Sequence, residues 1–540
     1  MENVMRMQEG LVTYRILATA GFGASNGRRS PWYRITTDGL SCIDDALRII
    51  SPSTTIVLPK EYCPSGHIVF TPSAFKDFEP EGMLRRQPYL AALAEALDFV
   101  RSAGQQDLAF CELEEKLKGL LPGLPLDYTP PERKRPQASP AAREEGSESF
   151  IDDLLSIVAT GADGSSSPAS SSGTAFHGMR MQLEEAVRQC MRHIVNNPEF
   201  RAMESAWQGA AFVIRNAMNG EGNLPVELSL VSVDEGGIPA LLKELQETDP
   251  SKLPNLILLD FDIKNTPKGM ELLENIIATA DRLMVPVAAS IAPDFFGIAE
   301  WGDIGKLSYI KSFLEQPQYA KWRKFQKLGG ASWAMLFLNR FPARPLHTGM
   351  DIGKERIELK EKKQPWISPV WGYGALAAMS AATTGWPMAA ENHREFQLES
   401  IPLQDDDPIP LEMLIPDDRI TQLLESGFNP FSARKRDDAI FLTGLSTING
   451  KPAGFQIFFG TLVAFLIRLQ ESTEPGNSDI AKMVRSQLEA FLTRGGRKCP
   501  DDLEVSLSYD AGSGADIMSI AFTPPPSIIR AERLELNLRW

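Results

Sequence analysis

The feature that most constrains the fold is an alternation of apolar runs with helix-period segments in the middle of the chain. Helix-period segments at residues 183–196 and 199–218 are followed by four short apolar runs, at residues 226–233, 255–263, 285–291 and 333–338. Runs of this kind are typical of strands buried on both faces, and helices between them return the chain for parallel pairing. The sequence therefore predicts a large α/β body with a mostly parallel sheet over residues 182–400.

The two ends of the chain differ from this body in pattern. Residues 1–120 are predicted to form a small α/β unit, with strands at 11–20, 53–58 and 68–71 and a helix at 89–100. Residues 401–540 continue the body and close with an α+β appendage, for which we expect a helix at 479–493 and strands at 503–509, 517–522 and 534–540. The expected fold class is thus multidomain α/β.

A linker is predicted between these regions, over residues 121–181. Six prolines lie among mixed charges between residues 121 and 148, and residues 161–173 are almost entirely Gly, Ser, Ala and Pro. Such segments cannot bury enough apolar surface to fold alone. A short helix at 149–159 interrupts the linker, with Ile151, Leu154, Leu155 and Val158 on one face. This helix either packs back on the body or offers its apolar face to a partner.

Composition argues against several classes of function. The 55 Lys and Arg against 70 Asp and Glu give a net charge of −15, which opposes non-specific nucleic-acid binding. The start of the chain lacks a signal-peptide pattern, so a cytoplasmic location is expected. Residues 367–390 are uncharged and long enough to span a membrane, but their small residues and two prolines favour a buried helix over membrane insertion. Five cysteines and five histidines are scattered without metal-ligand spacing, so no metal or cofactor site is expected.

One pair of carboxylates offers the only defensible enzymatic hypothesis. Asp260 and Asp262 follow a predicted strand at the spacing that haloacid-dehalogenase-like phosphatases use for nucleophile and acid/base. The residues after them, Ile263, Lys264 and Asn265, do not fit that site. The purely structural interpretation is that a strand ends here and the chain turns into a helix. We therefore expect no catalytic residues, with an α/β phosphatase or hydrolase as the alternative.

Residues 196–209 form the most distinctive segment. A proline-started helix is predicted, with Phe200, Met203 and Trp207 as its apolar stripe. Together with Pro198, Glu204 and Gly209, this order resembles the signature of the large sheath subunit of type VI secretion systems (TssC, or VipB). Asn196 and Asn197 stand where that family has paired histidines, and Gln208 stands in place of an arginine.

Further residues match landmarks of the same family in the same order. They are Trp322, Arg340, Phe341, Arg344, Trp371, Gly385, Trp386, Gly427 and Phe428. Near the N-terminus, Phe75, the run from Asp77 to Pro80 and the leucine-rich residues 90–97 resemble the small sheath subunit (TssB, or VipA). The resemblance therefore implies that two sheath subunits are fused in one chain.

The resemblance also implies a function and partners. The chain would be the structural protomer of a helical contractile sheath and not an enzyme, assembled around an Hcp-like inner tube on a baseplate. Neighbouring protomers would join by adding strands to a shared sheet, and a ClpV-like AAA+ unfoldase would recognise the helix containing Phe150, Ile151, Leu154, Leu155 and Val158. The sheath of a phage-tail-like injection device is the further alternative.

Overall fold

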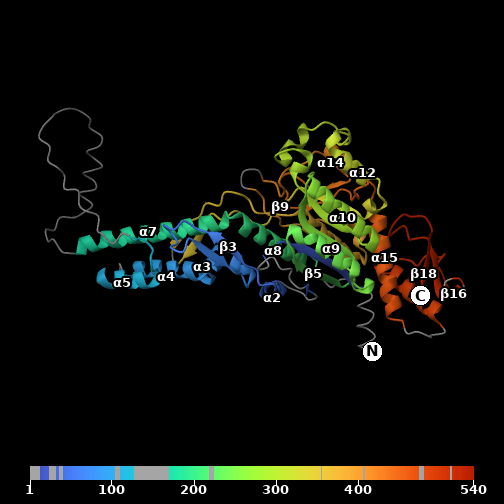
Figure 1. Ribbon diagram of the computed structural model, residues 1–540, viewed down its shortest axis with the longest axis horizontal. Coiled ribbons are helices and arrows are strands. Elements are labelled where there is room, and N and C mark those ends of the chain that lie inside the picture. The colour runs from blue at the N-terminus through green and yellow to red at the C-terminus, as the bar shows by residue number, and fades with distance from the viewer. Residues whose placement is uncertain are drawn as a thin grey trace.

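The computed structural model describes residues 12–23, 32–35, 41–103, 110–126, 169–217, 224–353, 355–404, 408–473, 479–510, 512 and 514–540. Figure 1 shows a body built around a twisted sheet, with an arm of helices extending from one side. A smaller helix-and-sheet unit formed by the C-terminal residues lies on the opposite side. The helix predicted at 149–159 lies outside the described residues.

A seven-stranded sheet forms the centre of the body, in the order β13-β8-β7-β6-β1-β5-β2. All neighbours in it pair in parallel except β2 and β5. The predicted mostly parallel sheet is thus confirmed. The strands span Tyr14–Ala20 (β1), Tyr33–Ile35 (β2), Val226–Ser232 (β5), Leu256–Ile263 (β6), Val287–Ile291 (β7), Ala334–Leu338 (β8) and Phe428–Pro430 (β13).

The position of β1 departs from the expected separation of the N-terminal unit. This strand lies between β5 and β6, with Tyr14 opposite Val226 and Ile16 opposite Leu256. The first strand of the expected small unit is therefore a central strand of the body, and the two regions share one sheet. An apolar run indicates that a strand is buried, but it carries no information about which strands pair with it.

Helices cover both faces of the sheet, and neighbouring residues of β1 point into different cores. Ile16 and Ala18 pack with helices α8 (Pro198–Ala217) and α13 (Pro369–Thr384), whereas Leu17 packs with α9 (Ile238–Glu247) and α10 (Pro267–Leu283). This alternation follows from the two-residue repeat of a strand. It explains why β1 is apolar at almost every position.

The arm consists mainly of α4 (Pro88–Ala103), α5 (Phe110–Leu120) and α7 (Ala169–Val195), which Figure 1 shows extending away from the body. Helix α7 begins inside the predicted linker, because residues from 169 onward are helical. The Gly, Ser and Ala residues at its start have no apolar period, so the sequence does not reveal this part of the helix.

A charged network joins the arm to a hairpin of the body, formed by β10 (Gly349–Ile352) and β11 (Glu355–Glu358). Arg101 of α4 donates Nη1 to the carbonyl oxygen of Ile352 at 2.7 Å and pairs through Nη2 with Glu355 at 2.9 Å. It also lies 3.5 Å from Glu184 of α7. The hairpin is therefore held by both long helices of the arm, near the C-terminal end of α4.

The C-terminal residues form the predicted α+β unit. Helix α16 (Ile480–Leu492) packs beside a three-stranded antiparallel sheet of β16 (Glu504–Asp510), β17 (Ala515–Phe522) and β18 (Leu534–Arg539). Helix α15 (Gly454–Glu471) joins this unit to the body. Its Gln470 donates to the carbonyl oxygen of Arg539 in β18, and its Arg468 donates to the carbonyl oxygens of Thr13 and Leu253.

The remaining elements are short. They are α2 (Ser41–Ile50), β3 (Thr54–Val57), β4 (His67–Phe70), α3 (Pro80–Arg86), α11 (Ile310–Phe313), α12 (Ala320–Phe325), β9 (Phe341–Pro342), β12 (Trp366–Ile367), α14 (Asp417–Glu425), β14 (Ser432–Ala433) and β15 (Ile440–Phe441), with several 3-10 turns. Helix α13, in the uncharged stretch of the sequence, is buried against the sheet. Within the described ranges, no helix has the length and apolar character needed to cross a bilayer.

Candidate functional site

Helix α8 carries the distinctive segment and forms the junction between the N-terminal region and the body. Pro198 occupies the first turn, and Asn197 accepts a hydrogen bond from the backbone N–H of Phe200 at 2.9 Å, which caps the helix. Phe200, Met203 and Trp207 are each at most 2% exposed. The sequence thus starts the helix at a proline and buries its apolar stripe.

The partners of this stripe come from the first hundred residues. The ring of Phe200 packs edge-on against Phe70 with ring centroids 5.3 Å apart. Trp207 donates its Nε1–H to the carbonyl oxygen of Phe22 at 3.1 Å, and the two rings lie 4.9 Å apart. Helix α8 therefore holds the N-terminal region through aromatic contacts that are fully buried.

Gly209 lies where α8 crosses α13, and its lack of a side chain permits the crossing. A Cβ atom at this position would lie 2.4 Å from Cδ1 of Trp371. The indole of Trp371 in turn donates Nε1–H to Oδ2 of Asp260 at 2.7 Å. The two helices can thus approach closely, and the end of β6 is tied to α13.

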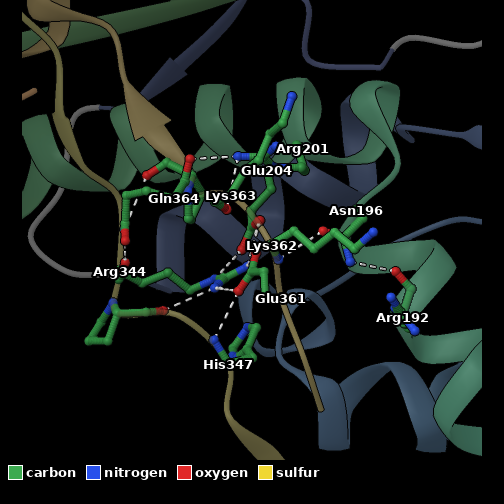
Figure 2. Close-up of polar contacts among 12 residues, drawn as sticks. Arg192, Asn196, Arg201, Glu204, Arg344, His347, Glu361, Lys362, Lys363 and Gln364 are labelled. Carbon is green, nitrogen blue, oxygen red and sulfur yellow. Dashed lines mark hydrogen bonds and ion pairs between the residues drawn. The ribbon is translucent and has the colours of Figure 1, made fainter. Parts of the chain in front are cut away.

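A buried ion cluster is the most unusual polar feature of α8, and Figure 2 shows its members. The guanidinium of Arg344 bonds both carboxylate oxygens of Glu204, at 2.7 and 3.0 Å, and both of Glu361, at 2.7 and 3.1 Å. The side chains of Glu204, Arg344 and Glu361 are 1%, 12% and 0% exposed. Two carboxylates therefore share one cation away from water.

Burial and pairing act in opposite directions on the pKa values of this cluster. Burial raises the pKa of Glu204 above its usual range despite the neighbouring Arg344. Burial alone would lower the pKa of Arg344, but the two carboxylates outweigh it and raise that pKa. The backbone N–H of His347 adds a hydrogen bond to Glu361 at 2.9 Å. The cluster is therefore a fixed structural joint whose stability depends on Arg344.

The segment after Glu361 is held on the same helices, as Figure 2 shows. Arg201 donates to the carbonyl oxygens of Gln364 and Lys363, at 2.5 and 3.1 Å. Asn196 accepts a hydrogen bond from the backbone N–H of Lys362 at 3.0 Å. The side chain of Asn196 thus links the end of α7 to this segment.

The structure brings some of the other landmark residues together with α8 and leaves others apart. Phe341 packs on Phe212 of α8, with ring centroids 4.9 Å apart, and Arg340 pairs with Glu412 at 2.6 Å. Trp322 stacks on Phe428 at 4.8 Å in the core on the opposite face of the sheet.

Two landmark glycines adopt the left-handed conformation. Gly427 precedes β13 with φ of 89°, where a Cβ would lie 2.4 Å from the carbonyl oxygen of Ile448. Gly385 ends α13 with φ of 76°, and the adjacent Trp386 packs on Phe491 of α16. These landmarks are thus packing and turn positions spread over three parts of the fold.

Asp260 and Asp262 lie at the carboxyl end of β6 and line a cavity of about 750 Å³. Each carboxylate has a fixed partner, because Trp371 donates to Asp260 and Ser290 donates its hydroxyl to Asp262 at 2.7 Å. Among the residues that the structure describes, no three metal-binding side chains gather closely enough to hold an ion. The two carboxylates are therefore engaged in holding neighbouring elements.

Asp260→Asn is expected to stabilise the protein at neutral pH. Burial raises the pKa of Asp260 to about 6, despite the hydrogen bond from Trp371, so ionising this carboxylate opposes folding. The free-energy cost of ionising Asp260 in the folded protein is absent below pH 4 and fully present above pH 6. A pKa shift of this size corresponds to about 1–3 kcal/mol. Asparagine keeps an acceptor for Trp371. Urea unfolding should show a higher free energy of unfolding for the variant than for wild type at pH 7 and no difference at pH 4. A variant less stable than wild type at pH 7 would contradict this prediction.

One residue of the ion cluster escaped prediction from the sequence. Glu361 lies in the run Lys360-Glu361-Lys362-Lys363, which is typical of a solvated surface, yet its side chain is fully buried. Its partner Arg344 was identified only as a family landmark. No pattern within the run distinguishes Glu361 from a surface glutamate, because its burial depends on contacts with residues outside the run, among them Arg344.

Two sequence comparisons identify tail sheath proteins. Residues 178–449 match the family model VipB, described as EvpB/VC_A0108, tail sheath N-terminal domain. The type VI secretion system sheath protein TssC1 of Pseudomonas aeruginosa is 20% identical over 296 residues, or 48% of this chain. The match covers 59% of that relative's length.

Solved structures of sheath proteins show a weaker likeness. The contracted helical sheath of the anti-feeding prophage has 11% identity and a TM-score of 0.36, over 61% of this chain and 80% of that chain. A sheath tail protein from Listeria innocua has 8% identity and a TM-score of 0.32, over 56% and 59%. The residues matched by the VipB family model make up half of this chain. The chain belongs to the VipB family of tail sheath proteins.

Proposed function

We propose that this chain is the structural protomer of a helical contractile sheath in a type VI-like secretion system. The observation that carries the proposal is the tail sheath family match over residues 178–449, which includes α8, the ion cluster and most of the sheet. The relatives named above are sheath proteins and not enzymes. The hydrogen-bonded state of Asp260 and Asp262 gives no support to the phosphatase alternative.

We further propose that the chain unites a small-subunit region with a large-subunit region. The support is the depth of their contact: β1 is a central strand of the sheet, and Phe22 and Phe70 pack on α8. A contact of this kind between separate subunits would depend on their concentrations. Fusion fixes their ratio at one to one and makes the contact intramolecular.

Assembly into a tube requires surfaces that join neighbouring copies, and the C-terminal sheet offers them. Strands β16 and β18 are the two outer strands of this sheet, and within the described part of the chain neither has a second partner strand. Unpaired backbone groups at such edges accept strands from other chains. We propose that neighbours add strands here, and that contraction is a change between two packings of the assembled copies.

Electron microscopy of the purified full chain tests the sheath proposal. Tubes with a central lumen are expected, and an inner tube protein of the Hcp type should occupy that lumen when both are produced together. A monomer that hydrolyses phosphate esters would overturn the proposal. Neighbouring genes for an inner tube protein and a baseplate distinguish a secretion system from a phage-tail-like device.

Leu154→Asp is expected to abolish capture of a ClpV-like AAA+ unfoldase while leaving tubes intact. The resemblance proposes residues 149–159 as the unfoldase-docking helix, and a carboxylate in its apolar face opposes burial in a partner's groove. Pull-down with the unfoldase measures binding, and microscopy of the same preparation measures assembly. Loss of tubes would instead assign the segment a structural role, whereas Asp153→Asn, on the opposite face, should change neither result.

A further inference from the structure

An apolar groove lies on the arm, beside the point where the described chain stops at Leu126. It has a volume of about 410 Å³ and is lined mainly by Tyr62, Leu124, Pro125, Leu126, Met181 and Ala186. Met181 is 46% exposed, which makes it one of the few large apolar side chains of the described chain that face solvent. A hollow with this lining favours an apolar occupant.

The groove lies between residues that precede and residues that follow the segment 127–168 in the sequence. One wall is the stretch 124–126, which leads directly into residues 127–168. The other wall is α7, which begins at Ala169, directly after that segment. The groove therefore adjoins the point where residues 127–168 leave the described chain, and it lies about 18 Å along α7 from the point where they rejoin it.

Residues 127–168 contain one apolar stretch that fits such a groove. Most of the segment is Pro, Gly, Ser, Ala and charged residues, but residues 150–158 read Phe-Ile-Asp-Asp-Leu-Leu-Ser-Ile-Val. At helical spacing, Ile151, Leu154, Leu155 and Val158 share one face, and Asp152 and Asp153 lie on the other. Docking through the apolar face would keep both carboxylates away from Glu61 and Glu185 at the groove.

We propose that the apolar face of residues 150–158 docks in this groove within the same chain. The connection is long enough, because the ten residues between Val158 and Ala169 span up to about 33 Å. From Ala169 to Met181 the helix rises only about 18 Å. A tether of this length holds the segment near the groove at an effective concentration of about a millimolar, so a weak contact suffices.

Docking has a consequence for the proposed unfoldase partner. The apolar face cannot lie in the groove and in a partner's groove at the same time, so the two compete. This consequence rests on the proposed function, whereas the docking itself does not. The groove would then limit capture of the segment to conditions in which the arm releases it.

The test measures whether the chain's own segment blocks the groove. A fluorescent peptide of residues 148–160 is titrated into the full chain and into a full chain carrying Leu154→Asp and Leu155→Asp, with fluorescence anisotropy as the readout. Binding at least about tenfold tighter to the variant is expected, because its own tethered segment no longer competes. Circular dichroism verifies that both proteins are folded, and tube formation does not enter the measurement.

Substitutions in the groove identify the binding surface. In the Leu154→Asp/Leu155→Asp background, Met181→Asp is expected to abolish peptide binding. Met284→Asp, at a residue of similar type that is 36% exposed on another surface, should leave it unchanged. Equal affinity for wild type and variant, no binding to either, or binding that survives Met181→Asp would overturn the proposal. If diluting the wild-type chain makes it bind the peptide as tightly as the variant does, the segment of a second copy occupies the groove. That result would also overturn the proposal.

Discussion

Arg344→Met is expected to lower the free energy of unfolding by about 3–5 kcal/mol at pH 7, because it leaves two buried carboxylates without their cation. Glu204 and Glu361 are 1% and 0% exposed, and Arg344 bonds both through its guanidinium. Methionine keeps much of the volume, so lost packing contributes little. Chemical denaturation followed by circular dichroism measures the change.

The stability lost in Arg344→Met should depend on pH in a predictable direction. Burial already raises the pKa of Glu204, and removing Arg344 takes away the cation that opposes this rise, so the pKa of Glu204 rises further. A carboxyl whose pKa is raised in the folded state opposes folding only at pH values where it is ionised. The deficit of Arg344→Met should therefore be smaller at pH 5 than at pH 8.

Two further variants control for other causes. Arg485→Met removes an exposed pair with Glu489 on α16, where the side chains are 52% and 43% exposed, and should cost less than about 1 kcal/mol. Adding Glu204→Gln and Glu361→Gln to Arg344→Met should restore part of the stability, since no buried charge remains. A pH-independent deficit, or no recovery in the triple variant, would show that the cluster acts through packing alone.

Local patterns predicted five of the seven strands of the sheet, all but β2 and β13, and did not predict which strands are neighbours. The apolar runs at 255–263 and 285–291 contain β6 and β7, because a strand buried on both faces must be apolar at nearly every position. The pairing of β1 with β5 and β6 joins residues more than two hundred positions apart. No feature of residues 11–20 distinguishes a central strand of the body from a strand of a separate unit.

In the candidate site, too, local spacing could be predicted and contacts between distant segments could not. The stripe of Phe200, Met203 and Trp207 could be predicted because its spacing matches a helix face. Glu361 could not, because a glutamate among lysines is ordinarily solvated and its burial depends on a cation seventeen positions away. Arg468 is similar, since this buried cation is satisfied by carbonyl oxygens and an amide that lie together only after folding.

Trp207→Ala is expected to cost about 3–5 kcal/mol of folding free energy, which is typical of deleting a fully buried aromatic side chain. The indole is 0% exposed, packs against Phe22 and donates to its carbonyl oxygen. Trp207→Phe keeps most of the ring contact and loses only that hydrogen bond, so it should cost about 1–3 kcal/mol. Denaturation of both variants measures the difference, and equal costs would show that ring volume is unimportant here.

The same variant tests whether the N-terminal region folds with the body. Because β1 lies between β5 and β6, losing the Trp207 contact with Phe22 should weaken all three strands together. Hydrogen exchange of Trp207→Ala should therefore accelerate by a similar factor in β1, β5 and β6, within a single unfolding transition. Faster exchange confined to residues 12–23, with β5 and β6 unchanged, would show that the region behaves as a separate unit. A shared transition would mean that the N-terminal region, proposed to be a small-subunit region, and the body form one cooperative protomer, which is the property that the proposed sheath needs to transmit force between its copies.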